Sequence, residues 1–237
     1  MRLPTDYKLT EIQQQFIREK LLTDEFIDMT RETTMPIEKL MAYYRCVIME
    51  IETKFRVLNE QLSLEYDRNP IESIKTRLKS WDGIVKKIRN KNLPFNLKAV
   101  EENINDIAGI RVICSFQEDI YKLADSLLRQ DDVKLIRMKD YIANPKKNGY
   151  RSLHLIVEVP IFLQDETRLM KAEVQLRTIA MDFWASLDHK LRYKKNIPAA
   201  DAEVIAKELY ECSVISADLD SRMQQIKNEI AQAELIE

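Results

Sequence analysis

The segment Arg168–Thr178 (RLMKAEVQLRT) combines the residue types of a phosphate-handling site with the alternation of a β-strand. One face of such a strand carries apolar side chains, from Met170, Ala172, Val174 and Leu176. The opposite face carries polar side chains, from Lys171, Glu173, Gln175 and Arg177. Cations beside a carboxylate and an amide can bind a phosphate, a metal ion or a reacting hydroxyl. We interpret the polar row as the lining of a site, and a solvated sheet face is the alternative.

A second carboxylate, Asp106, stands at the start of the apolar, β-branched segment Ile107–Phe116, which predicts a buried strand. Mg²⁺ in nucleotide sites takes one or two protein carboxylates and completes its shell with water and phosphate oxygens. Asp106 and Glu173 on adjacent strands would suit that ion. Strict alternation, however, places Asp106 and Arg111 on opposite faces. Either Asp106 lies in the turn before the strand, or Gly109 forms a bulge that changes the parity.

The connector Asn144–Ser152 (NPKKNGYRS) holds three cations, an amide and an aromatic ring. Lysine and arginine can contact phosphates, asparagine can pair with a base edge, and Tyr150 offers a stacking surface. A charged hairpin turn is the alternative interpretation. The sequence has no G-x-x-x-x-G-K-[ST], no G-x-G-x-x-G and no H-E-x-x-H. Phosphate chemistry would therefore depend on positioned cations and a carboxylate-held Mg²⁺.

Charge is concentrated in one stretch of an otherwise balanced chain. Between Arg68 and Lys91 there are eight basic and two acidic residues, although the net charge of the protein is −2. This stretch indicates a surface for a polyphosphate or a partner, with a solvated helix face as the alternative.

Helices and strands must position these residues. Periodicity predicts a helix over Ile37–Leu62, opened by Pro36. Further helices are predicted over Ile71–Ile88, Gln117–Gln130 and Ile179–Tyr193, and from Pro198 to the end. Tyr7–Met29 is helical in composition. The predicted strands are Ile107–Phe116, Val133–Tyr141, Leu153–Val159 and Arg168–Thr178. We expect an α+β fold with a small mixed β-sheet flanked by helices and with long N- and C-terminal helices. Phe183, Trp184 and Leu187 are expected to cover or border the polar face of the last strand.

Composition excludes several classes of protein. With 237 residues, 45% hydrophobic and 32% charged, the chain has enough apolar residues for a core and is not disordered. Three glycines argue against a turn-rich β-sandwich or barrel. Three separated cysteines indicate neither a disulfide framework nor a zinc ribbon. No run approaches about 18 apolar residues, so we expect a cytoplasmic protein without membrane contact.

Five segments, in this order, resemble the RelA/SpoT-type alarmone synthetases. They are RLKS (Arg77–Ser80), DIAGIRV (Asp106–Val112), KDYIANPKKNGYRSLH (Lys139–His154), EVQLRT (Glu173–Thr178) and FWASLDHKLRYK (Phe183–Lys194). The resemblance covers about Pro70 to Lys194 and is greatest to the single-domain members, the small alarmone synthetases. It implies a nucleotidyltransferase-like sheet in one synthetase domain. That domain would have a helical N-terminal part (1–69), a catalytic core (70–195) and a C-terminal helix (198–237).

The family resemblance implies transfer of pyrophosphate from ATP to the 3′-hydroxyl of GDP or GTP, yielding AMP and ppGpp or pppGpp. Asp106 and Glu173 would bind Mg²⁺, and Glu173 would also accept the 3′-hydroxyl proton. ATP would contact four cations, with Arg77 and Arg111 at the adenine and Lys79 and Lys87 at the phosphates. The guanosine nucleotide would contact six residues: Tyr150 by stacking, with Asn148, Gln175 and the Ala185 backbone at the base, and Lys146 and His154 near the phosphates.

Two residues depart from the family pattern. Gly83 stands where members often have serine, and Asn90 where they often have arginine, so two expected phosphate donors are absent from the stripe of Lys79, Gly83, Lys87 and Asn90. On this view Arg77 lies off that stripe of the basic helix.

Two further expectations follow from the family. We expect synthesis without hydrolysis, because the chain has no room for the hydrolase domain of the long members. We expect a homo-oligomer, a tetramer by resemblance, whereas packing of the two long helices on each other within one chain is the alternative. The competing functions are a catalytically silent guanine-nucleotide sensor and an RNA-binding regulator. RNA binding is less favoured because the chain is net acidic.

Overall fold

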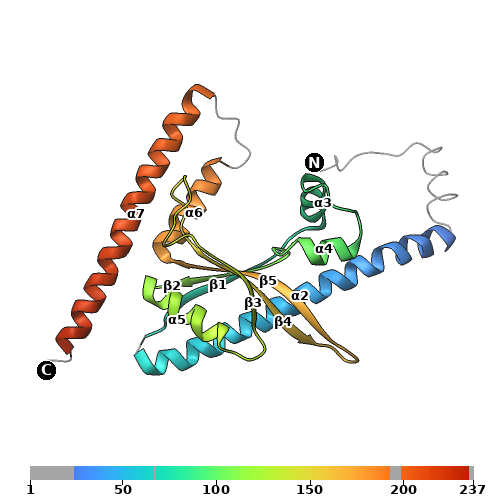
Figure 1. The fold of residues 1–237 in the computed structure, drawn as a ribbon, viewed down its shortest axis with the longest axis horizontal. Helices are drawn as coiled ribbons and strands as arrows, with labels where there is room; N and C mark the ends of the chain where they lie inside the picture. Colours follow the sequence, from blue (N-terminus) through green and yellow to red (C-terminus); the bar gives the residue numbers. More distant parts are fainter. Residues whose placement is uncertain (1–23, 67, 193–198, 235–237) are drawn as a thin grey trace, which may run out of the picture. The chain divides into compact units, whose positions relative to one another are not determined.

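The computed structural model describes residues 24–66, 68–192 and 199–234 (Figure 1). Residues 44–237 form one compact unit and residues 1–43 a second, of which only 24–43 are described. The expected helix Tyr7–Met29 lies outside the described residues as far as residue 23. No helix in the described ranges is both long enough and apolar enough to cross a bilayer.

The larger unit is built on a five-stranded mixed sheet. Its strands are β1 (Ile71–Leu78), β2 (Ala108–Cys114), β3 (Lys134–Asp140), β4 (Leu153–Phe162) and β5 (Thr167–Thr178). Their order in the sheet is β1-β2-β5-β4-β3. The central pair, β2 and β5, is parallel, and every other pair is antiparallel. The predicted α+β fold with a small mixed sheet is confirmed.

The helices are α2 (Asp24–Tyr66), α3 (Trp81–Asn90), α4 (Leu97–Asn103), α5 (Gln117–Leu128), α6 (Ile179–Arg192) and α7 (Ala199–Glu234). The long N- and C-terminal helices are therefore present. The prediction that Pro36 opens the first of them is wrong, because α2 begins at Asp24 and contains Pro36. The short helix α4 was not predicted. Its N-cap is Asn96, whose side chain accepts a hydrogen bond from the Ala99 amide at 2.8 Å.

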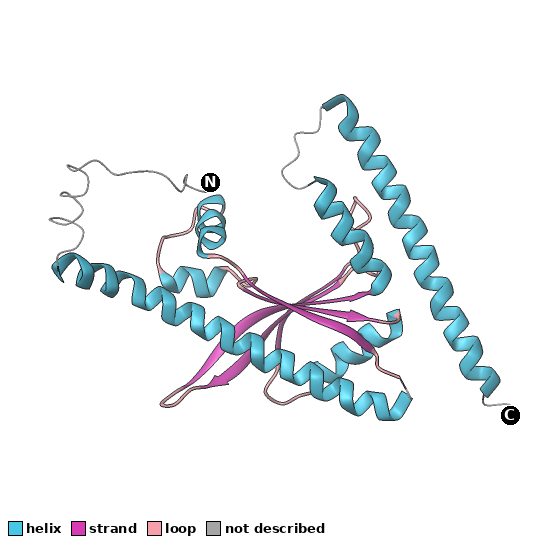
Figure 2. Cartoon of the chain, turned by 180° about the vertical axis from the view of Figure 1, so that it is seen from behind, coloured by secondary structure: helices cyan, strands magenta, loops and turns pink. Residues whose placement is uncertain are grey.

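The core lies between the apolar face of the sheet and the helices α2 and α5 (Figure 2). Its most deeply buried side chains include Val47, Ile51 and Phe55 of α2, Leu123 and Leu127 of α5, and Val174 and Leu176 of β5. Burying a side chain of this size contributes about 1.5–3 kcal/mol. Lys54 joins α2 to the turn before β3 through its ion pair with Asp132, at 2.7 Å. The apolar stripe of α2 from Tyr44 onward is therefore covered by the chain itself.

The predicted helix Ile71–Ile88 is wrong in its first half, where the chain forms β1 and pairs with β2. A register shift between Ile71 and Ser73 explains the false signal. The extra residue, Glu72, changes the parity of the strand, so Ile71 and Ile74 pair with Cys114 and Val112 on the apolar face. A bulged strand thus reproduces the three-residue spacing of a helix. The helix α3 begins only after Ser80, whose hydroxyl accepts a hydrogen bond from the Gly83 amide.

The predicted C-terminal helix is confirmed, but its apolar stripe is not buried in this chain. The stripe consists of Ile205, Leu209, Cys212, Ile215, Leu219, Met223, Ile226 and Ile230, and all of them except Leu209 are exposed. The buried positions of α7 include the polar residues Ser213 and Asp220. Asp220 accepts hydrogen bonds from Thr178 at 2.9 Å and from Gln117 at 3.2 Å. The helix therefore docks through polar contacts at the end of β5 and leaves its hydrophobic stripe open.

Candidate active site

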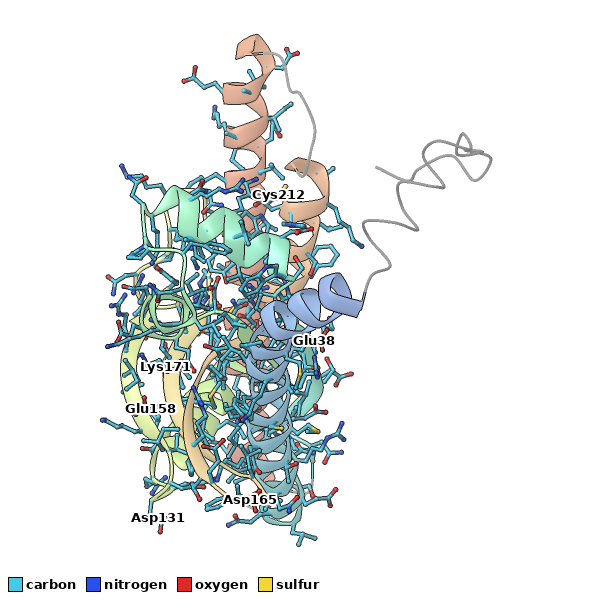
Figure 3. All side chains as sticks on the ribbon, turned by 90° about the vertical axis from the view of Figure 1, so that its right-hand side faces the viewer. Glu38, Asp131, Glu158, Asp165, Lys171 and Cys212 are labelled. Atoms are coloured by element: carbon cyan, nitrogen blue, oxygen red, sulfur yellow. The ribbon has the colours of Figure 1, made fainter. Side chains whose placement is uncertain are left out.

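The strand register aligns polar side chains from all five strands on one face of the sheet. One row crosses the sheet in the order Lys75, Arg111, Gln175, His154 and Lys139. The next row runs Arg77, Gly109, Glu173, Ile156 and Arg137. A third row, shown by Lys171 and Glu158 in Figure 3, continues to Lys134. Directly paired residues point to the same face of a sheet, so these rows form one continuous polar surface.

Asp106 lies in the turn immediately before β2, which begins at Ala108, so the parity conflict with Arg111 does not arise. Its Oδ2 accepts a hydrogen bond from Lys79 Nζ at 2.8 Å, and its Oδ1 lies 2.7 Å from Lys87 Nζ. Burial raises the pKa of the Asp106 carboxyl, but the two lysines outweigh burial and hold this pKa below its usual value. Asp106 is therefore an anion held between two ammonium groups.

Glu173 projects from the middle of β5 beside this turn. Its Oε2 accepts a hydrogen bond from Gln175 Nε2 at 2.9 Å, and its Oε1 lies 3.4 Å from His154 Nδ1. Burial raises the pKa of the Glu173 carboxyl and so does the negative charge of Asp106, whereas the contacts with His154 and Gln175 lower it and prevail. Glu173 is thus an ionised carboxylate at neutral pH, available to accept a proton or a cation.

Tyr150 is tied to this carboxylate through its hydroxyl group. The hydroxyl oxygen accepts a hydrogen bond from Arg177 Nη2 at 2.5 Å and lies 2.8 Å from His154 Nε2. The ionised Glu173 carboxylate can only accept a hydrogen bond, so a neutral His154 imidazole carries its proton on Nδ1, facing Glu173, and its Nε2 accepts the Tyr150 hydroxyl proton. The Tyr150 ring itself contacts Lys146, whose Nζ lies 4.6 Å from both the Tyr150 and Tyr141 ring centroids.

The loop that carries Tyr150 rests against α7 at Gly149. This glycine has φ +87°, a left-handed conformation that favours glycine, and an added Cβ would lie 1.8 Å from Ser213 Oγ. The Asn148 side chain accepts a hydrogen bond from the Tyr150 amide at 3.3 Å and so shapes the same turn. The loop conformation is therefore set by its own sequence and by α7 together.

Two cavities lie on either side of the carboxylate pair, and both are lined by Asp106 and Glu173. One, of about 380 Å³, is lined also by Lys75, Arg77, Lys79, Arg111 and Gln175, among others. The other, of about 320 Å³, is lined also by Lys87, Arg137, Lys139, Tyr141, Lys146 and His154, among others. Each has the volume of a small-molecule site. Two cavities that are lined by cations and share two carboxylates are typical of a site in which two charged substrates meet.

The structure distributes the predicted residues between these cavities. Arg77, Lys79 and Arg111 line the larger one, as does Gln175, although Gln175 was expected at the guanine. Lys87 lines the smaller one, although it was expected at ATP, and its ammonium binds the shared Asp106. Lys146 and His154 line the smaller one, as expected. Ala185, a buried residue of α6, lines neither of them, and the same is true of Tyr150 and Asn148.

The basic helix and the covering of the polar face need correction. Arg77 belongs to β1 and Lys79 precedes α3, so the expected stripe of Lys79, Gly83, Lys87 and Asn90 is not one helical face. Among the expected apolar side chains, Phe183 is 64% exposed and Leu187 41% exposed, whereas the buried Trp184 donates a hydrogen bond to the Leu209 carbonyl on α7. The residue of α6 that borders the polar face is Asp182, within hydrogen-bonding distance of Arg111 and Arg177.

Several residues of the site received no place in it from the sequence, namely Lys75 and Lys91, which were counted only within the basic stretch, and Asn105, Arg137, Lys139, Tyr141 and Asp182. Four of them lie on or next to β1 and β3, the two edge strands. Once β1 is recognised as a strand, the cross-strand register places Lys75 and Lys139 in the row of Gln175. That register is the signal that would have identified them.

Comparisons with known proteins agree with this architecture. Residues 76–198 match the family described as "Region found in RelA / SpoT proteins". GTP pyrophosphokinase YwaC of Bacillus subtilis (strain 168) is 44% identical over 187 residues, which are 79% of this chain and 88% of that protein. The chain belongs to the RelA/SpoT family, as its motifs predicted.

Solved structures of the small alarmone synthetase 1 from Bacillus subtilis extend the similarity to the fold. The synthetase bound to its product pppGpp is 34% identical, with a TM-score of 0.73, over 83% of this chain and 99% of that one. The same synthetase bound to AMPCPP is 31% identical, with a TM-score of 0.69, over 84% and 99% of the two chains. The fold of this chain is that of a small alarmone synthetase.

Proposed function

We propose that this chain is a GTP pyrophosphokinase that transfers pyrophosphate from ATP to the 3′-hydroxyl of GDP or GTP. The products are AMP and ppGpp or pppGpp. The observation that carries the proposal is the single pair of ionised carboxylates, Asp106 and Glu173, that lines both cavities. A donor nucleotide in one cavity and an acceptor nucleotide in the other would meet at this pair. The relatives named above for this activity or its product match over most of their length.

ATP would occupy the larger cavity. Arg77 and Arg111 project from neighbouring strands of the polar face and would flank the adenine. Lys79 would bind the phosphates in this cavity, and Lys87, which lines the smaller cavity, would reach them across Asp106, which both lysines contact. Guanidinium and ammonium groups held in advance stabilise the negative charge of the transferred group, which is the main requirement of phosphoryl transfer.

GDP or GTP would occupy the smaller cavity, with the base stacked on Tyr150, which contacts the lining residues Lys146 and His154. Because Lys146 now lies over the Tyr150 ring, a stacked guanine would displace its ammonium group. The freed Lys146, with His154, would then contact the guanosine phosphates, and Lys139 lines the same space. Asn148, Gln175 and the Ala185 backbone are the remaining proposed contacts of the base.

Mg²⁺ is the cofactor that the carboxylate pair fits. Among the described residues no group of three or more histidine, cysteine, aspartate or glutamate side chains could hold a metal ion. Two carboxylates that open onto cavities lined by cations suit an ion that takes its remaining ligands from water and substrate phosphates. We propose Asp106 and Glu173 as its protein ligands. When bound, Mg²⁺ would neutralise charge on the phosphates.

The proposed reaction is a direct transfer that needs no covalent enzyme intermediate. The 3′-hydroxyl oxygen of the acceptor forms a bond to the β-phosphorus of ATP, and the bond from that phosphorus to the α–β bridging oxygen breaks. AMP leaves with that oxygen, and the 3′-hydroxyl proton passes to Glu173. Glu173 suits this task because it is ionised and its Oε2 is already oriented by Gln175. We propose synthesis without hydrolysis.

The proposed function is tested by following AMP and pppGpp with purified protein, ATP and Mg²⁺. AMP release is expected only when GDP or GTP is present, in amounts equal to the alarmone formed. Nucleotide binding without AMP release would instead identify a silent sensor, and binding of RNA without either would identify an RNA-binding regulator. Either result would overturn the enzymatic proposal.

Gly109 provides a prediction about the ATP side. An added Cβ would meet no atom nearer than the Arg77 carbonyl oxygen, at 3.5 Å, so Gly109→Ala should fold and melt as the wild type does. That Cβ would enter the larger cavity between Arg77 and Glu173. We expect the KM for ATP to rise about five- to fiftyfold, the effect of overpacking a well-fitted site. Steady-state kinetics checks this, and an equal rise in the KM for GDP would contradict it.

We also propose a cytoplasmic homo-oligomer, a tetramer by family resemblance. The observation in support is the exposed apolar stripe of α7, which includes Ile215 at 70% and Ile230 at 55% exposed. Monomeric proteins rarely leave such a stripe open to water. Multi-angle light scattering should give about four times the chain mass of 28.0 kDa. A 28.0 kDa particle at micromolar concentration would show that α7 serves another purpose.

A further inference from the structure

Asp182 lies in the first turn of α6 and contacts Lys75 and Arg111, which line the larger cavity, and Arg177. This helix begins at Ile179, directly after Thr178 of β5, whose hydroxyl accepts a hydrogen bond from the Met181 amide at 3.2 Å. A carboxylate in the first turn also lies at the positive end of the helix dipole. Asp182 is itself only 7% exposed, so its place is fixed by the helix start and by burial.

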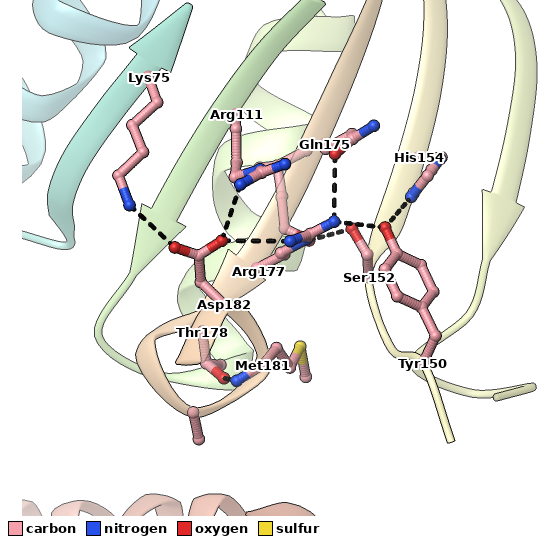
Figure 4. A network of polar contacts seen from close by, with 12 residues as sticks. Lys75, Arg111, Tyr150, Ser152, His154, Gln175, Arg177, Thr178, Met181 and Asp182 are labelled. Carbon is pink, nitrogen blue, oxygen red and sulfur yellow. Dashed lines mark hydrogen bonds and ion pairs between the residues drawn. The ribbon is translucent and has the colours of Figure 1, made fainter. Parts of the chain in front are cut away.

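Three cations from three strands converge on the Asp182 carboxylate (Figure 4). Its Oδ1 accepts hydrogen bonds from Arg111 Nη1 and Arg177 Nη1, each at 3.1 Å, and its Oδ2 accepts one from Lys75 Nζ at 2.9 Å. The two guanidinium groups are close because they share this Oδ1, and burial together with the Arg177 charge lowers the pKa of the Arg111 guanidinium. Asp182 is the anion that allows them to stand side by side.

Arg177 carries this contact to the guanosine side of the site. Its side chain is 5% exposed, and its Nη2 donates hydrogen bonds to the Tyr150 hydroxyl and, at 3.2 Å, to Gln175 Oε1. Gln175 in turn donates to Glu173, and Tyr150 reaches Glu173 through His154. Five side chains therefore form a closed ring: Glu173, Gln175, Arg177, Tyr150 and His154. The ring holds both the proposed base and the proposed stacking surface.

We propose that Asp182 is a positioning residue for pyrophosphate transfer, which fixes Arg111 on the ATP side and, through Arg177, the ring of Tyr150, Gln175 and Glu173 on the acceptor side. Asp182 lines neither cavity, so it acts through the two arginines rather than by touching a substrate. The inference rests on the function proposed above and adds a residue that couples the two substrates.

The substitution Asp182→Asn distinguishes a role of Asp182 in positioning the site from a role in binding ATP. The substitution removes an anion from a cluster of three cations, so the site becomes more positive and attraction for ATP is not reduced. Arg177 loses the charged partner that orients it, so the ring is released. We expect kcat to fall about ten- to hundredfold, because Arg177, which orients the ring around Glu173, loses a charge-assisted hydrogen bond. The KM for GDP should rise as well. The affinity for AMPCPP, measured by calorimetry, should stay equal or become tighter.

Two variants serve as controls. Asp132→Asn makes the same substitution in the ion pair with Lys54, outside both cavities, and should leave kcat within about twofold of the wild type. Asp182→Glu keeps the charge and should recover part of kcat. If Asp182→Asn does not fold, Asp182→Glu is used for the test instead. An Asp182→Glu protein that melts as the wild type does but has lost all kcat and all AMPCPP binding would overturn the proposal.

A double-mutant cycle with Arg177→Gln gives the sharpest outcome. If Asp182 acts through Arg177, the double variant should be no slower than Arg177→Gln alone. Additive losses, or a kcat of Asp182→Asn close to that of the wild type, would overturn the inference. Those results differ from a failure of the proposed function, in which the wild-type chain itself would form no AMP or pppGpp.

Discussion

Replacing Glu173 with glutamine is expected to give a folded protein that still binds both nucleotides but forms almost no pppGpp. Glutamine is nearly isosteric with glutamate, and its amide oxygen can still accept the hydrogen bond from Gln175. The substitution removes the anion that would accept the 3′-hydroxyl proton and bind Mg²⁺. Loss of a general base alone lowers the rate about 10²–10⁴-fold, and weaker metal binding adds to this loss.

The matched control for this variant is Glu158→Gln. Glu158 lies on β4, on the same face of the sheet and one row away, opposite Lys171, and it lines neither cavity. Its side chain is 17% exposed and lies 3.9 Å from Lys134, so the same charge is removed under similar burial. We expect kcat within about twofold of the wild type for this control, since it is away from the site. Turnover of Glu173→Gln near the wild-type value would contradict the proposed mechanism.

The central strands of the fold could be predicted because their sequence patterns are local. The alternation of Arg168–Thr178 appears in the structure as buried Met170, Ala172, Val174 and Leu176 opposite the less buried Glu173 and Gln175. Such alternation depends only on one strand having one buried face. The pairing of the two carboxylates was also accessible, because Asp106 and Glu173 precede or occupy the adjacent strands β2 and β5.

Features that depend on distant parts of the chain could not be predicted in this way. The apolar spacing of Ile71 and Ile74 predicts a helix locally, and only pairing with β2 reveals the bulge that makes this segment a strand. Asp182 looks like one more charge on an amphipathic helix. Its importance comes from arginines on two other strands. No local pattern contains that information.

The long C-terminal helix was predicted from a local pattern, but that pattern did not identify the face of the helix that packs on the rest of the chain. Its apolar stripe is the strongest signal in the segment, yet the positions of α7 that pack on the catalytic unit include Ser213 and Asp220. Ser213 lies directly against Gly149 of the loop that holds Tyr150. A hydrophobic stripe predicts that something covers it, but it does not say whether that partner is the same chain.

Replacing Asp106 with asparagine is expected to abolish the response to Mg²⁺ while leaving metal-free ATP binding intact or tighter. In the structure Asp106 holds Lys79 and Lys87 at 2.8 and 2.7 Å. Both lysines are therefore partly neutralised until a divalent cation takes their place on the carboxylate. Asparagine would release the two ammonium groups for phosphates and would remove a negative charge next to the triphosphate. It would also remove one of the two proposed carboxylate ligands of Mg²⁺, an ion that prefers anionic oxygen.

Calorimetric titration of AMPCPP, in EDTA and in Mg²⁺, tests this exchange directly. For the wild type, Mg²⁺ should strengthen binding, because an ion held by Asp106 would release Lys79 and Lys87 for the phosphates. For Asp106→Asn, binding in EDTA should equal or exceed that of the wild type, and Mg²⁺ should add little. Turnover should fall on the order of 10²-fold or more, since metal stabilisation of phosphoryl transfer amounts to several kcal/mol. The control is Asp125→Asn, an exposed carboxylate paired with Arg129 on α5, which should behave as the wild type. Equal strengthening of AMPCPP binding by Mg²⁺ in the wild type and in Asp106→Asn would show that the ion is held elsewhere.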